Sequence, residues 1–594
     1  MILLLTPPMV QVNAPYAATP LLAGFLRDEK IPFAQADLSL GLALRLFSPA
    51  GLAELRGALQ GRKKLPKTAR IFLAQFDAFQ RAVTPAVRFL QTHDPATSHR
   101  VAQPGFLPGG WRLEQAGNDL HPLFGQCGTH DRATHLASLF LDEITDVVRD
   151  TVDPRFALSR YAETLAQSLP SLDPLLEELN KETLLTRWLE KLTDDAMRGR
   201  EPRVVAITCP FPGTLLGAFR VARRVKALAP VAKVALGGGY PSTELRELAD
   251  PRVFDYFDAV VLDDGRAPLL DLWQGRAPAT GFTRENGRVV FHPGGRVPPS
   301  PPPRPDFTGL PLGDYLSLVE IPNPMHRLWS DACWLKLPLA NGCYWRKCAF
   351  CDTSLPHIRD CAQPGAGRVV ENLFKLHAET GKTAFHFTDE ALSPKLLSEI
   401  SNELIARGSP FTWWGNVRFE RGFTNGLAQR MAAAGCVAVS GGLECANDRL
   451  LALMRKGVDL RSARSALRAF AGAGIMAHAY LMYGFPTQTL REIRGALEFL
   501  RQCFAEGVVQ SAYWHRFTLT AHSPVLANPG AFGVQPCEEP LQGPRFARNT
   551  VRHVVKDADG LDAIGESLHR ATYNYMLGAG LDLPVKEWFN ENVQ

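Results

Sequence analysis

The sequence has no apolar run long enough to cross a membrane and no tract rich in lysine or arginine. A membrane-spanning helix needs about 20 mostly apolar residues, and sequence-independent nucleic-acid binding needs a dense group of cations. We therefore expect no membrane span and no nucleic-acid partner. The apolar start, Met1–Thr6, stops at Pro7 and has no basic segment before it, which predicts a buried strand and not a signal peptide.

The net charge of the chain is also small. The formal net charge is only +5 over 594 residues, and the chain has 11 cysteines. With 46% hydrophobic and 21% charged residues the composition is that of a globular protein, and the length predicts two or three domains. Eleven cysteines in a long chain without an export signal favour reduced thiols and a cytoplasmic location.

No internal repeat is visible, and the one low-complexity segment is the proline-rich stretch Pro293–Pro305. Such a stretch has few backbone donors and favours extended backbone, so we expect a semi-rigid spacer between two domains. The predicted organisation is a first domain over residues 1–290 with a helical insertion at about 46–200, a linker over 291–325, a second domain over 326–530 and a helical C-terminal extension over 531–594.

The first domain alternates strands and helices, with glycine turns after strands. This order predicts an α/β fold with a doubly wound, Rossmann-like sheet. The expected strands are Ile2–Leu5, Phe33–Asp37, Val204–Thr208, Lys233–Leu236 and Ala259–Leu262. Within the insertion, amphipathic spacing predicts helices at Thr134–Arg149, Ala157–Leu169 and Leu175–Leu192.

The second domain has six strand–helix units, which predict a partial TIM-like barrel, (βα)6, with parallel strands. In such folds the reactive groups lie at the carboxyl ends of the strands. The expected strands are Trp334–Leu339, Ala384–Thr388, Thr412–Asn416, Ala438–Leu443, Ala477–Met482 and Tyr513–Leu519.

Three cysteines stand close together directly after the first expected strand of this barrel. Cys343, Cys348 and Cys351 are separated by four and then two residues. Thiolates at such spacing hold one iron–sulfur cluster or one zinc ion. Three ligands on a four-iron cluster leave one iron open for chemistry, whereas a structural zinc ion would recruit a fourth ligand from Cys333 or Cys361.

This loop resembles the cluster loop of the radical S-adenosylmethionine (SAM) enzymes, in which three and then two residues separate the cysteines and an aromatic residue precedes the third. Here the first spacer has one residue more, and Phe350 is the aromatic residue. The resemblance implies that Cys343, Cys348 and Cys351 hold a 4Fe-4S cluster whose open iron chelates SAM, and that reductive cleavage of SAM releases a 5′-deoxyadenosyl radical. It also implies that Phe350 packs beside the cluster and the adenine, and that an electron donor such as flavodoxin or ferredoxin serves the cluster.

Polar residues after later strands match positions at which this family binds SAM. Asp389 and Glu390 follow the second strand, where a carboxylate often receives the SAM ammonium group; a pair of acids at a helix N-terminus is the alternative. Arg418 ends the third strand and would pair with the SAM carboxylate or with Glu444; an ordinary surface arginine is the alternative.

The segment Ser440–Gly457 resembles the family's fourth strand, whose glycines allow a ligand to approach closely. The resemblance implies that Glu444 faces the ribose or the amine of SAM. The alternative is an ordinary helix start capped by Asn447 or Asp448. Further along, Gly484–Pro486 resembles the turn after the fifth strand.

The first domain resembles the cobalamin-binding domain that precedes the barrel in one large branch of these enzymes. The matching cofactor positions are Thr208, at a strand end, and the run Gly237, Gly238 and Gly239, where backbone can approach a large cofactor closely. No Asp-x-His-x-x-Gly motif, which would supply a cobalt ligand, occurs at the expected place, and we expect His121 to be an ordinary histidine. A domain that has kept the fold and lost the cofactor is the alternative.

Together these resemblances imply a cobalamin-dependent radical SAM enzyme, a methyltransferase acting on an unactivated carbon of a small molecule or peptide. Two alternatives remain. One is a radical SAM enzyme that performs cyclisation, rearrangement or oxidation without methyl transfer. The other is a zinc-stabilised binding protein without catalysis. The fold does not identify the substrate.

Overall fold

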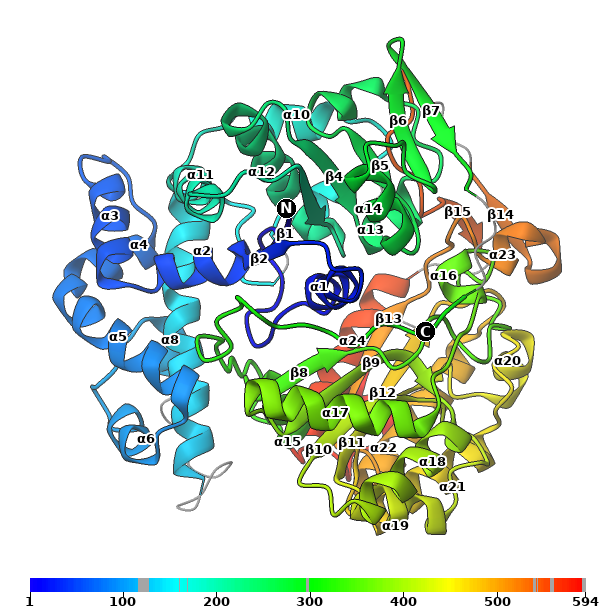
Figure 1. The fold of residues 1–594 in the computed structure, drawn as a ribbon. Helices are drawn as coiled ribbons and strands as arrows, with labels where there is room; N and C mark the ends of the chain where they lie inside the picture. Colours follow the sequence, from blue (N-terminus) through cyan, green and yellow to red (C-terminus); the bar gives the residue numbers. More distant parts are fainter. Residues whose placement is uncertain are drawn as a thin grey trace.

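The computed structural model describes residues 1–115, 128–159, 161–167, 169–294, 299–537, 541, 543–555 and 560–589, so His121 lies outside the described residues. Figure 1 shows a first sheet in the upper part of the molecule, a group of helices to its left and a second sheet below. The predicted α/β class is confirmed, because both large sheets are built mainly from parallel strands covered by helices.

The first sheet has seven strands in the order β2-β1-β3-β4-β5-β6-β7. Pairing is parallel from β2 to β5 and antiparallel from β5 to β7. The strands are β1 Ile2–Thr6, β2 Phe33–Asp37, β3 Val204–Thr208, β4 Lys233–Gly237, β5 Ala259–Val261, β6 Gly281–Glu285 and β7 Arg288–His292.

The order of the parallel strands reverses beside β1, as in a doubly wound sheet, and helices cover both faces. Ile2 and Leu4 of β1 pack in a core with helices α1 (Ala18–Asp28) and α14 (Arg266–Trp273), whereas Leu3 and Leu5 belong to the core on the other face. On that other face lies helix α12, Leu215–Leu228. Because both faces are buried, a continuous apolar sequence is expected in β1, and Ile2–Leu5 provide it.

The antiparallel hairpin of β6 and β7 extends the edge of this sheet and was not among the expected strands. Asn286 and Gly287 join the two strands, with φ angles of 49° and 77°. These left-handed values are those of a two-residue hairpin turn, for which Asn-Gly is the preferred sequence. An Asn-Gly pair between two β-rich runs is therefore the signal that could have predicted the hairpin.

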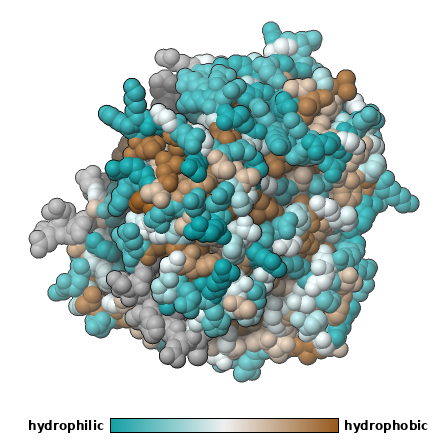
Figure 2. Space-filling model, turned by 90° about the vertical axis from the view of Figure 1, so that its left-hand side faces the viewer, coloured by the Kyte–Doolittle hydropathy of each residue, from teal (hydrophilic) through white to brown (hydrophobic). Residues whose placement is uncertain are grey.

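The helical insertion connects β2 to β3. Figure 2 views its side of the molecule and shows a mostly hydrophilic surface with hydrophobic patches scattered across it. The helices are α2 Leu38–Leu46, α3 Pro49–Leu59, α4 Lys67–Ala74, α5 Phe76–Thr92, α6 Pro95–Val101, α8 Thr129–Thr151, α9 Glu163–Ala166, α10 Asp173–Leu179 and α11 Leu184–Met197.

Helix α8 contains the predicted helix Thr134–Arg149, but two other predictions in the insertion are wrong. Among the described residues of Ala157–Leu169 the only helix is the short α9, because Ala162 adopts a left-handed φ of 53° immediately before it. Leu175–Leu192 is interrupted, because the Thr183 side chain caps a new helix, α11, at that point.

No single helix in the described ranges is long and apolar enough to span a membrane. Helices α2 and α3, bent by 69° at their junction, meet the length and composition required when they are taken together. Leucines of both helices lie in the core of the first domain.

The residues that directly follow the proline-rich segment are hydrogen-bonded to the first domain. The N–H of Asp306 donates to Pro20 O over 2.8 Å, and Gln35 Nε2 donates to the carbonyl of Thr308 over 2.8 Å. Further along, the N–H of Leu316 donates to Val12 O over 2.8 Å. The first domain thus satisfies backbone groups of the residues that follow the prolines, and this fixes the path of the chain into the barrel.

The second sheet has six parallel strands in the order β13-β12-β11-β10-β9-β8, so β8 and β13 are its two edges and the barrel is open. The strands are β8 Trp334–Leu337, β9 Ala384–Leu392, β10 Thr412–Val417, β11 Cys436–Glu444, β12 Met476–Tyr483 and β13 Ser511–Arg516. The main connecting helices are α17 Ala366–Thr380, α18 Pro394–Ala406, α19 Asn425–Ala433, α20 Asp448–Leu453, α21 Leu460–Gly472 and α22 Leu490–Ala505. All six expected strands are present.

The C-terminal segment is only partly helical. It first forms an antiparallel pair, β14 (Val534–Pro536) and β15 (His553–Val555), which the prediction of a helical extension missed. Helix α24 (Leu561–Met576) then packs on β13, where Trp514 Nε1 donates to Thr572 Oγ1 over 2.9 Å. The extension therefore covers the open edge of the barrel.

Candidate active site

The cysteine loop leaves the barrel directly after β8 and is fixed by backbone hydrogen bonds. The N–H of Cys343 donates to Ile358 O over 3.0 Å, and the N–H of Ala349 donates to Met454 O over 2.8 Å. Cys348 is buried, and Cys343 and Cys351 are partly buried. The loop is thus held by the segment that follows it and by the end of helix α20.

Asp389, on β9, holds the start of the same loop. Its carboxylate accepts hydrogen bonds from the N–H groups of Leu339 over 2.9 Å and of Ala340 over 2.7 Å. Burial raises the pKa of Asp389 to about 7, although both hydrogen bonds act to lower it. Both oxygens are engaged by backbone, so this geometry gives Asp389 a positioning role in the loop.

Glu390, the next residue of β9, points the other way because side chains alternate along a strand. Its side chain is exposed to solvent, and no hydrogen bond or ion pair is recorded for it in the described part of the chain. Although the side chain reaches solvent, the protein around it displaces part of its water, which raises its pKa, and the nearby His357 acts in the opposite direction. Of the two neighbouring carboxylates, Glu390 is thus the one available to a ligand.

Glu444 ends β11 and is paired with a lysine that the sequence analysis did not single out. Glu444 Oε1 lies 2.7 Å from Lys456 Nζ, and the two residues are only 8% and 7% exposed. Glu444 adopts a left-handed φ of 53° at the strand end. The resulting buried ion pair lies beside the cysteine loop, and the Lys456 ammonium is 5.9 Å from the centre of the Phe350 ring.

Lys456 places a positive charge next to two of the thiols. Burial acts to lower the pKa of Lys456, but Glu444, Cys348 and Cys351 together raise it above its usual value. In turn, a hydrogen bond from Cys351 and the charge of Lys456 lower the pKa of Cys348 to about 7. The surroundings therefore favour a thiolate at Cys348, and a thiolate is the form that binds metal.

Arg418 supports the back of the loop and does not pair with Glu444. Its guanidinium bonds to Glu420 over 2.8 Å, donates to the carbonyl oxygen of Lys456 and lies 4.0 Å from the centre of the Trp345 ring. Only 3% of the residue is exposed. The prediction that Arg418 pairs with Glu444 is wrong, because Lys456 occupies that position.

The carboxyl edge of the first sheet lies against the barrel mouth. His357 Nδ1, beyond the cysteine loop, is 3.3 Å from Oδ1 of Asp263, which follows β5. His522 Nε2, beyond β13, is 3.2 Å from Thr243 O in the first domain. The strand ends at which ligands bind in each fold therefore face one another.

The predicted cofactor positions on this edge differ in what they contact. The Thr208 hydroxyl is buried and has no hydrogen-bond partner within the described residues. A Cβ at Gly238, whose φ is +113°, would lie 2.7 Å from Cys209 O, and one at Gly239 would lie 2.7 Å from Pro210 O. The protein itself thus requires glycine at these two positions, whereas the Thr208 hydroxyl remains free for a ligand.

The inner face of the barrel carries polar and aromatic residues in register. Lys336, His386 and Trp414 are neighbours across β8, β9 and β10, and the His386 and Trp414 rings stack with centroids 3.5 Å apart. Burial lowers the pKa of Lys336 to about 8. Its recorded hydrogen bonds go to amide oxygens, those of Asn13 at 3.0 Å and Gln11 at 3.4 Å. This ammonium therefore has no recorded carboxylate partner among the described residues.

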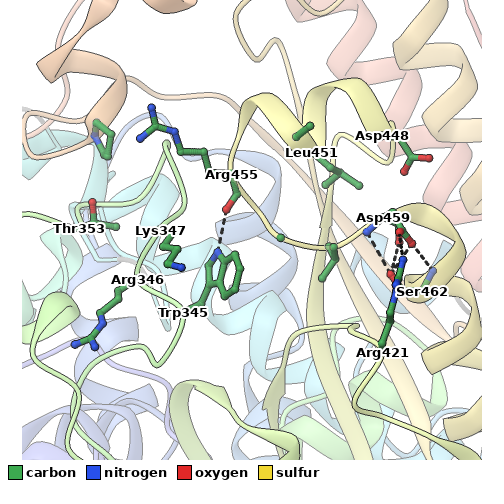
Figure 3. Close-up of a pocket in the computed structure, with 14 residues that line it drawn as sticks. Trp345, Arg346, Lys347, Thr353, Arg421, Asp448, Leu451, Arg455, Asp459 and Ser462 are labelled. Atoms are coloured by element: carbon green, nitrogen blue, oxygen red, sulfur yellow. Dashed lines mark hydrogen bonds and ion pairs between the residues drawn. The ribbon is translucent and has the colours of Figure 1, made fainter.

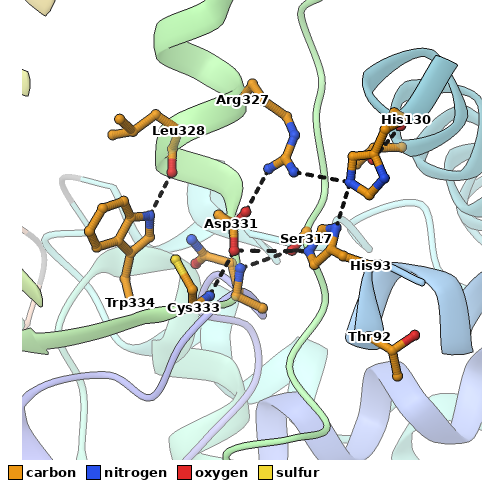
Figure 4. A network of polar contacts seen from close by, with 12 residues as sticks. Thr92, His93, His130, Ser317, Arg327, Leu328, Asp331, Cys333 and Trp334 are labelled. Carbon is orange, nitrogen blue, oxygen red and sulfur yellow. Dashed lines mark hydrogen bonds and ion pairs between the residues drawn. The ribbon is translucent and has the colours of Figure 1, made fainter. Parts of the chain in front are cut away.

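Cys333 lies at the amino end of β8, opposite to the cysteine loop. Its N–H donates to Asp331 over 2.9 Å, and Arg327 bonds to Asp331 over 2.8 Å in a network that reaches His130 of the helical insertion (Figure 4). Cys333 is therefore not available as a fourth ligand at the loop. In the described part of the chain, no group of three or more His, Cys, Asp or Glu side chains is arranged to hold a metal ion by itself.

The mouth of the parallel barrel thus brings together three cysteines of one loop and a buried Lys–Glu pair. The profile of the Radical SAM superfamily matches residues 337–500, a range that contains the cysteine loop and the strand ends described above. Residues 337–500 thus form a radical SAM domain, as the resemblance of the cysteine loop predicted.

This chain is similar to one relative in sequence and to two solved structures in fold. An uncharacterized methyltransferase of Pyrococcus horikoshii, PH0819, is 25% identical over 319 residues, which is 51% of this chain and 64% of the relative. The match thus covers less than two thirds of that relative. The radical SAM methyltransferase TsrM from Kitasatospora setae, solved with cobalamin and a 4Fe-4S cluster, is 18% identical with a TM-score of 0.46, over 63% of this chain and 77% of TsrM. The cobalamin-dependent SAM radical enzyme OxsB, solved with aqua-cobalamin, is 14% identical with a TM-score of 0.47, over 66% of this chain and 60% of OxsB.

Proposed function

We propose that this chain is a cobalamin-dependent radical SAM enzyme that transfers a methyl group to an unactivated carbon of a small molecule or peptide. The observation that carries the proposal is the position of the cysteine loop of a radical SAM domain against the carboxyl edge of a doubly wound sheet. Ligands of such sheets bind at that edge, so two cofactors held there would be neighbours. The relative named a methyltransferase supports methyl transfer as the reaction class.

Cys343, Cys348 and Cys351 fit the ligands of a 4Fe-4S cluster. Such a cluster is held by thiolates, and the buried ammonium of Lys456 lies beside Cys348 and Cys351. Glu444 holds that ammonium in place over 2.7 Å. We propose that Lys456 stabilises the negative charge of the loaded loop and that Glu444 fixes the position of Lys456.

Glu390 and Phe350 are the residues that we propose for SAM itself. The methionine part of SAM carries an ammonium group, for which the exposed and unpaired carboxylate of Glu390 is a suitable acceptor. Phe350 is partly exposed beside the thiols and would pack against the adenine. Asp389 accepts two N–H groups of the loop, and Arg418 bonds to Glu420 and to the carbonyl of Lys456, so in this proposal both residues position the site and do not bind SAM.

Thr208 is the residue that fits a cobalamin contact best. A buried hydroxyl without a partner is costly unless a ligand or water satisfies it, and this one lies at the carboxyl edge of the first sheet. Gly237, in front of the two glycines that pack on the protein, leaves room for close approach, since the nearest heavy atom to an added Cβ is 3.8 Å away. When bound, cobalamin would supply the methyl group, and the cluster with SAM would supply the radical that activates the substrate.

The inner face of the barrel is the proposed substrate site. Lys336 lacks a carboxylate partner and would bind an anionic group of the substrate. Trp414 Nε1, His386 Nδ1 and His478 Nε2 are buried without hydrogen-bond partners in the described residues and would bind its polar groups. The side chain of Tyr480, which is 37% exposed, lies further toward the mouth on β12.

Anaerobic reconstitution tests the proposal. The expected result is four irons per chain, retention of cobalamin through gel filtration, SAM-dependent release of 5′-deoxyadenosine, and transfer of isotopic label from the SAM methyl group to bound cobalamin. The matched control replaces all three loop cysteines by alanine, which should remove the iron and the SAM cleavage.

Each outcome of the reconstitution distinguishes the proposal from a different alternative function. Release of 5′-deoxyadenosine without retained cobalamin or label transfer would favour a radical SAM enzyme of another reaction class. Iron-free, colourless protein that holds zinc would refute the proposal altogether.

A further inference from the structure

Five side chains form one continuous group on the inner face of the barrel: Lys336, His386, Trp414, His478 and Trp329. We call them the inner-face group. The first four are each the third residue of their strand, so they lie below the carboxyl ends of β8, β9, β10 and β12. The Trp329 ring, from helix α15 (Pro324–Ser330), has its centre 6.2 Å from that of Trp414 and 4.6 Å from that of His478. The group therefore places one ammonium among four planar rings.

The inner-face group offers hydrogen-bond donors and has no acid beside it in the strands. Trp414 and His478 are only 7% and 2% exposed. Trp414 Nε1 and Trp329 Nε1, which can only donate, are buried without hydrogen-bond partners in the described residues, as are one ring nitrogen each of His386 and His478. Buried donors without acceptors are costly, so a ligand of this group is expected to bring acceptor atoms.

The charges of the six strands match a ligand with a single negative charge. Their acidic residues are Asp389, Glu390 and Glu444, all nearer to the carboxyl ends, and their only lysine or arginine residues are Lys336 and Arg516. Arg516 pairs with Asp562 over 2.6 Å, whereas the recorded partners of the Lys336 ammonium are amide oxygens. One unpaired ammonium can neutralise one carboxylate, and a phosphate dianion would bring a second charge without a partner in the strands.

Helix α15 lies beneath the inner-face group and is fixed to the end of the sheet. Its N-cap, Asn323, donates from Nδ2 to Gln510 O over 2.8 Å, and His326 Nε2 lies 3.1 Å from Ser511 Oγ on β13. A ligand therefore reaches the group from the mouth of the barrel. An approach from one end only favours a compact molecule over a peptide chain.

We propose that the substrate is a planar aromatic monocarboxylate whose ring carries a hydrogen-bond acceptor, such as a ring nitrogen or a carbonyl group. The inference rests on the proposed function and narrows the substrate of the same site. The Lys336 ammonium binds the carboxylate, the Trp414 and Trp329 N–H groups donate to the acceptor, and the rings of the inner-face group contact the planar ring system. An amino group on the substrate would find no acidic partner in the inner-face group, so an α-amino acid does not fit.

The test measures binding of three matched sets of probes to the reconstituted protein by anaerobic isothermal titration calorimetry. Positional isomers of quinoline carboxylate carry the charge, the planar rings and the ring nitrogen. Naphthoates lack the nitrogen, and quinolinemethanols lack the charge. K336Q removes the ammonium, and W414F removes the indole N–H while it keeps an aromatic ring.

A control is needed because an aromatic anion can also bind adventitiously to cations elsewhere. A pocket of about 880 Å³ between the cysteine loop and the start of α21 is lined by Trp345, Lys347 and Arg455 among others (Figure 3). It combines an aromatic ring with positive charge, and none of its lining residues belongs to the inner-face group. R455Q, which removes one positive charge there, is therefore the matched control for K336Q.

We expect at least one quinoline carboxylate to bind wild type and R455Q equally and K336Q about tenfold to a hundredfold more weakly, because loss of a charge-assisted hydrogen bond changes affinity by such factors. Quinolinemethanols should bind wild type and K336Q alike. W414F should weaken binding of quinoline carboxylates about threefold to tenfold and affect naphthoates less.

The substrate class would be overturned if no quinoline carboxylate bound wild type, if K336Q bound as tightly as wild type, or if R455Q lost affinity in place of K336Q. Equal effects of W414F on quinoline carboxylates and naphthoates would overturn the ring acceptor. Release of 5′-deoxyadenosine and transfer of the methyl label are measured without these probes. Their absence would count against the proposed function, whereas their presence with failed probe binding would count against the substrate class alone.

Discussion

Removal of the Lys456 ammonium is expected to destabilise the barrel strongly. The Lys456 to Glu444 distance is 2.7 Å, and less than a tenth of either residue is exposed. In K456M the Glu444 carboxylate stays buried without its partner, and loss of one member of a buried ion pair costs about 3–5 kcal/mol. We therefore expect K456M to lower the free energy of unfolding by that amount.

A double variant, E444Q/K456M, shows whether the loss of stability in K456M comes from the missing attraction or from the unpaired charge that stays buried at Glu444. In E444Q/K456M no charge is left buried, so this double variant should be more stable than K456M by about 2 kcal/mol or more. Buried Trp413 and Trp414 of β10 report on the barrel, so guanidinium unfolding of the cluster-free chain can be followed by tryptophan fluorescence.

The matched control is K63M, which changes an exposed lysine for which no ion pair is recorded in the described part of the chain. It should change the free energy of unfolding by no more than about 0.5 kcal/mol. The reasoning would be refuted if K456M unfolded at the same guanidinium concentration as K63M, or if E444Q/K456M were less stable than K456M.

Three further predictions concern the ligand-facing residues and the loop. E390Q should weaken SAM binding about tenfold to a hundredfold in equilibrium dialysis, because a hydrogen bond between charged groups contributes about 1.5–3 kcal/mol; unchanged affinity would exclude Glu390 as the partner of the ammonium. Val in place of Thr208 should reduce cobalamin retention without loss of stability, since the hydroxyl has no protein partner; retention equal to wild type would contradict the contact. Burial raises the pKa of Asp389 from 3.8 to about 7. Between these pH values the folded chain keeps a proton on Asp389 that the unfolded chain releases. The contribution of Asp389 to the free energy of unfolding therefore falls as pH rises from about 4 to about 7. The difference in unfolding free energy between wild type and D389N should therefore decrease as pH rises through that window, and a pH-independent difference would argue against the raised pKa.

Periodicity was sufficient to predict the six barrel strands and the first five strands of the doubly wound sheet. Buried parallel strands are short apolar runs, and each is followed by a helix, so local sequence carries their signal. The errors arose where a single residue interrupts such a run. Thr183 starts a new helix by capping it, and Ala162 breaks one by adopting left-handed φ.

The candidate site was only partly predictable. The cysteine loop could be recognised because its three thiols are close in sequence, and the profile match confirms a radical SAM domain over residues 337–500. Lys456 had no such signal, because its role depends on contact with Glu444, twelve residues away and on another element. The different roles of Asp389 and Glu390 depend on which face of β9 turns toward the loop, and strand alternation alone does not say which.

By itself, the sequence determined the class of fold, the cysteine loop and the order of the carboxylates that follow the strands, because each of these depends on residues that are neighbours along the chain. Only the tertiary structure decided which carboxylate is free, where the buried cation lies and how the linker joins the two sheets. These features depend on burial and on contacts between distant segments, such as the backbone hydrogen bond from Asp306 to Pro20. Desolvation and charge pairing act through space, and for this reason the partners of Lys456 and Lys336 emerge only when the chain is folded.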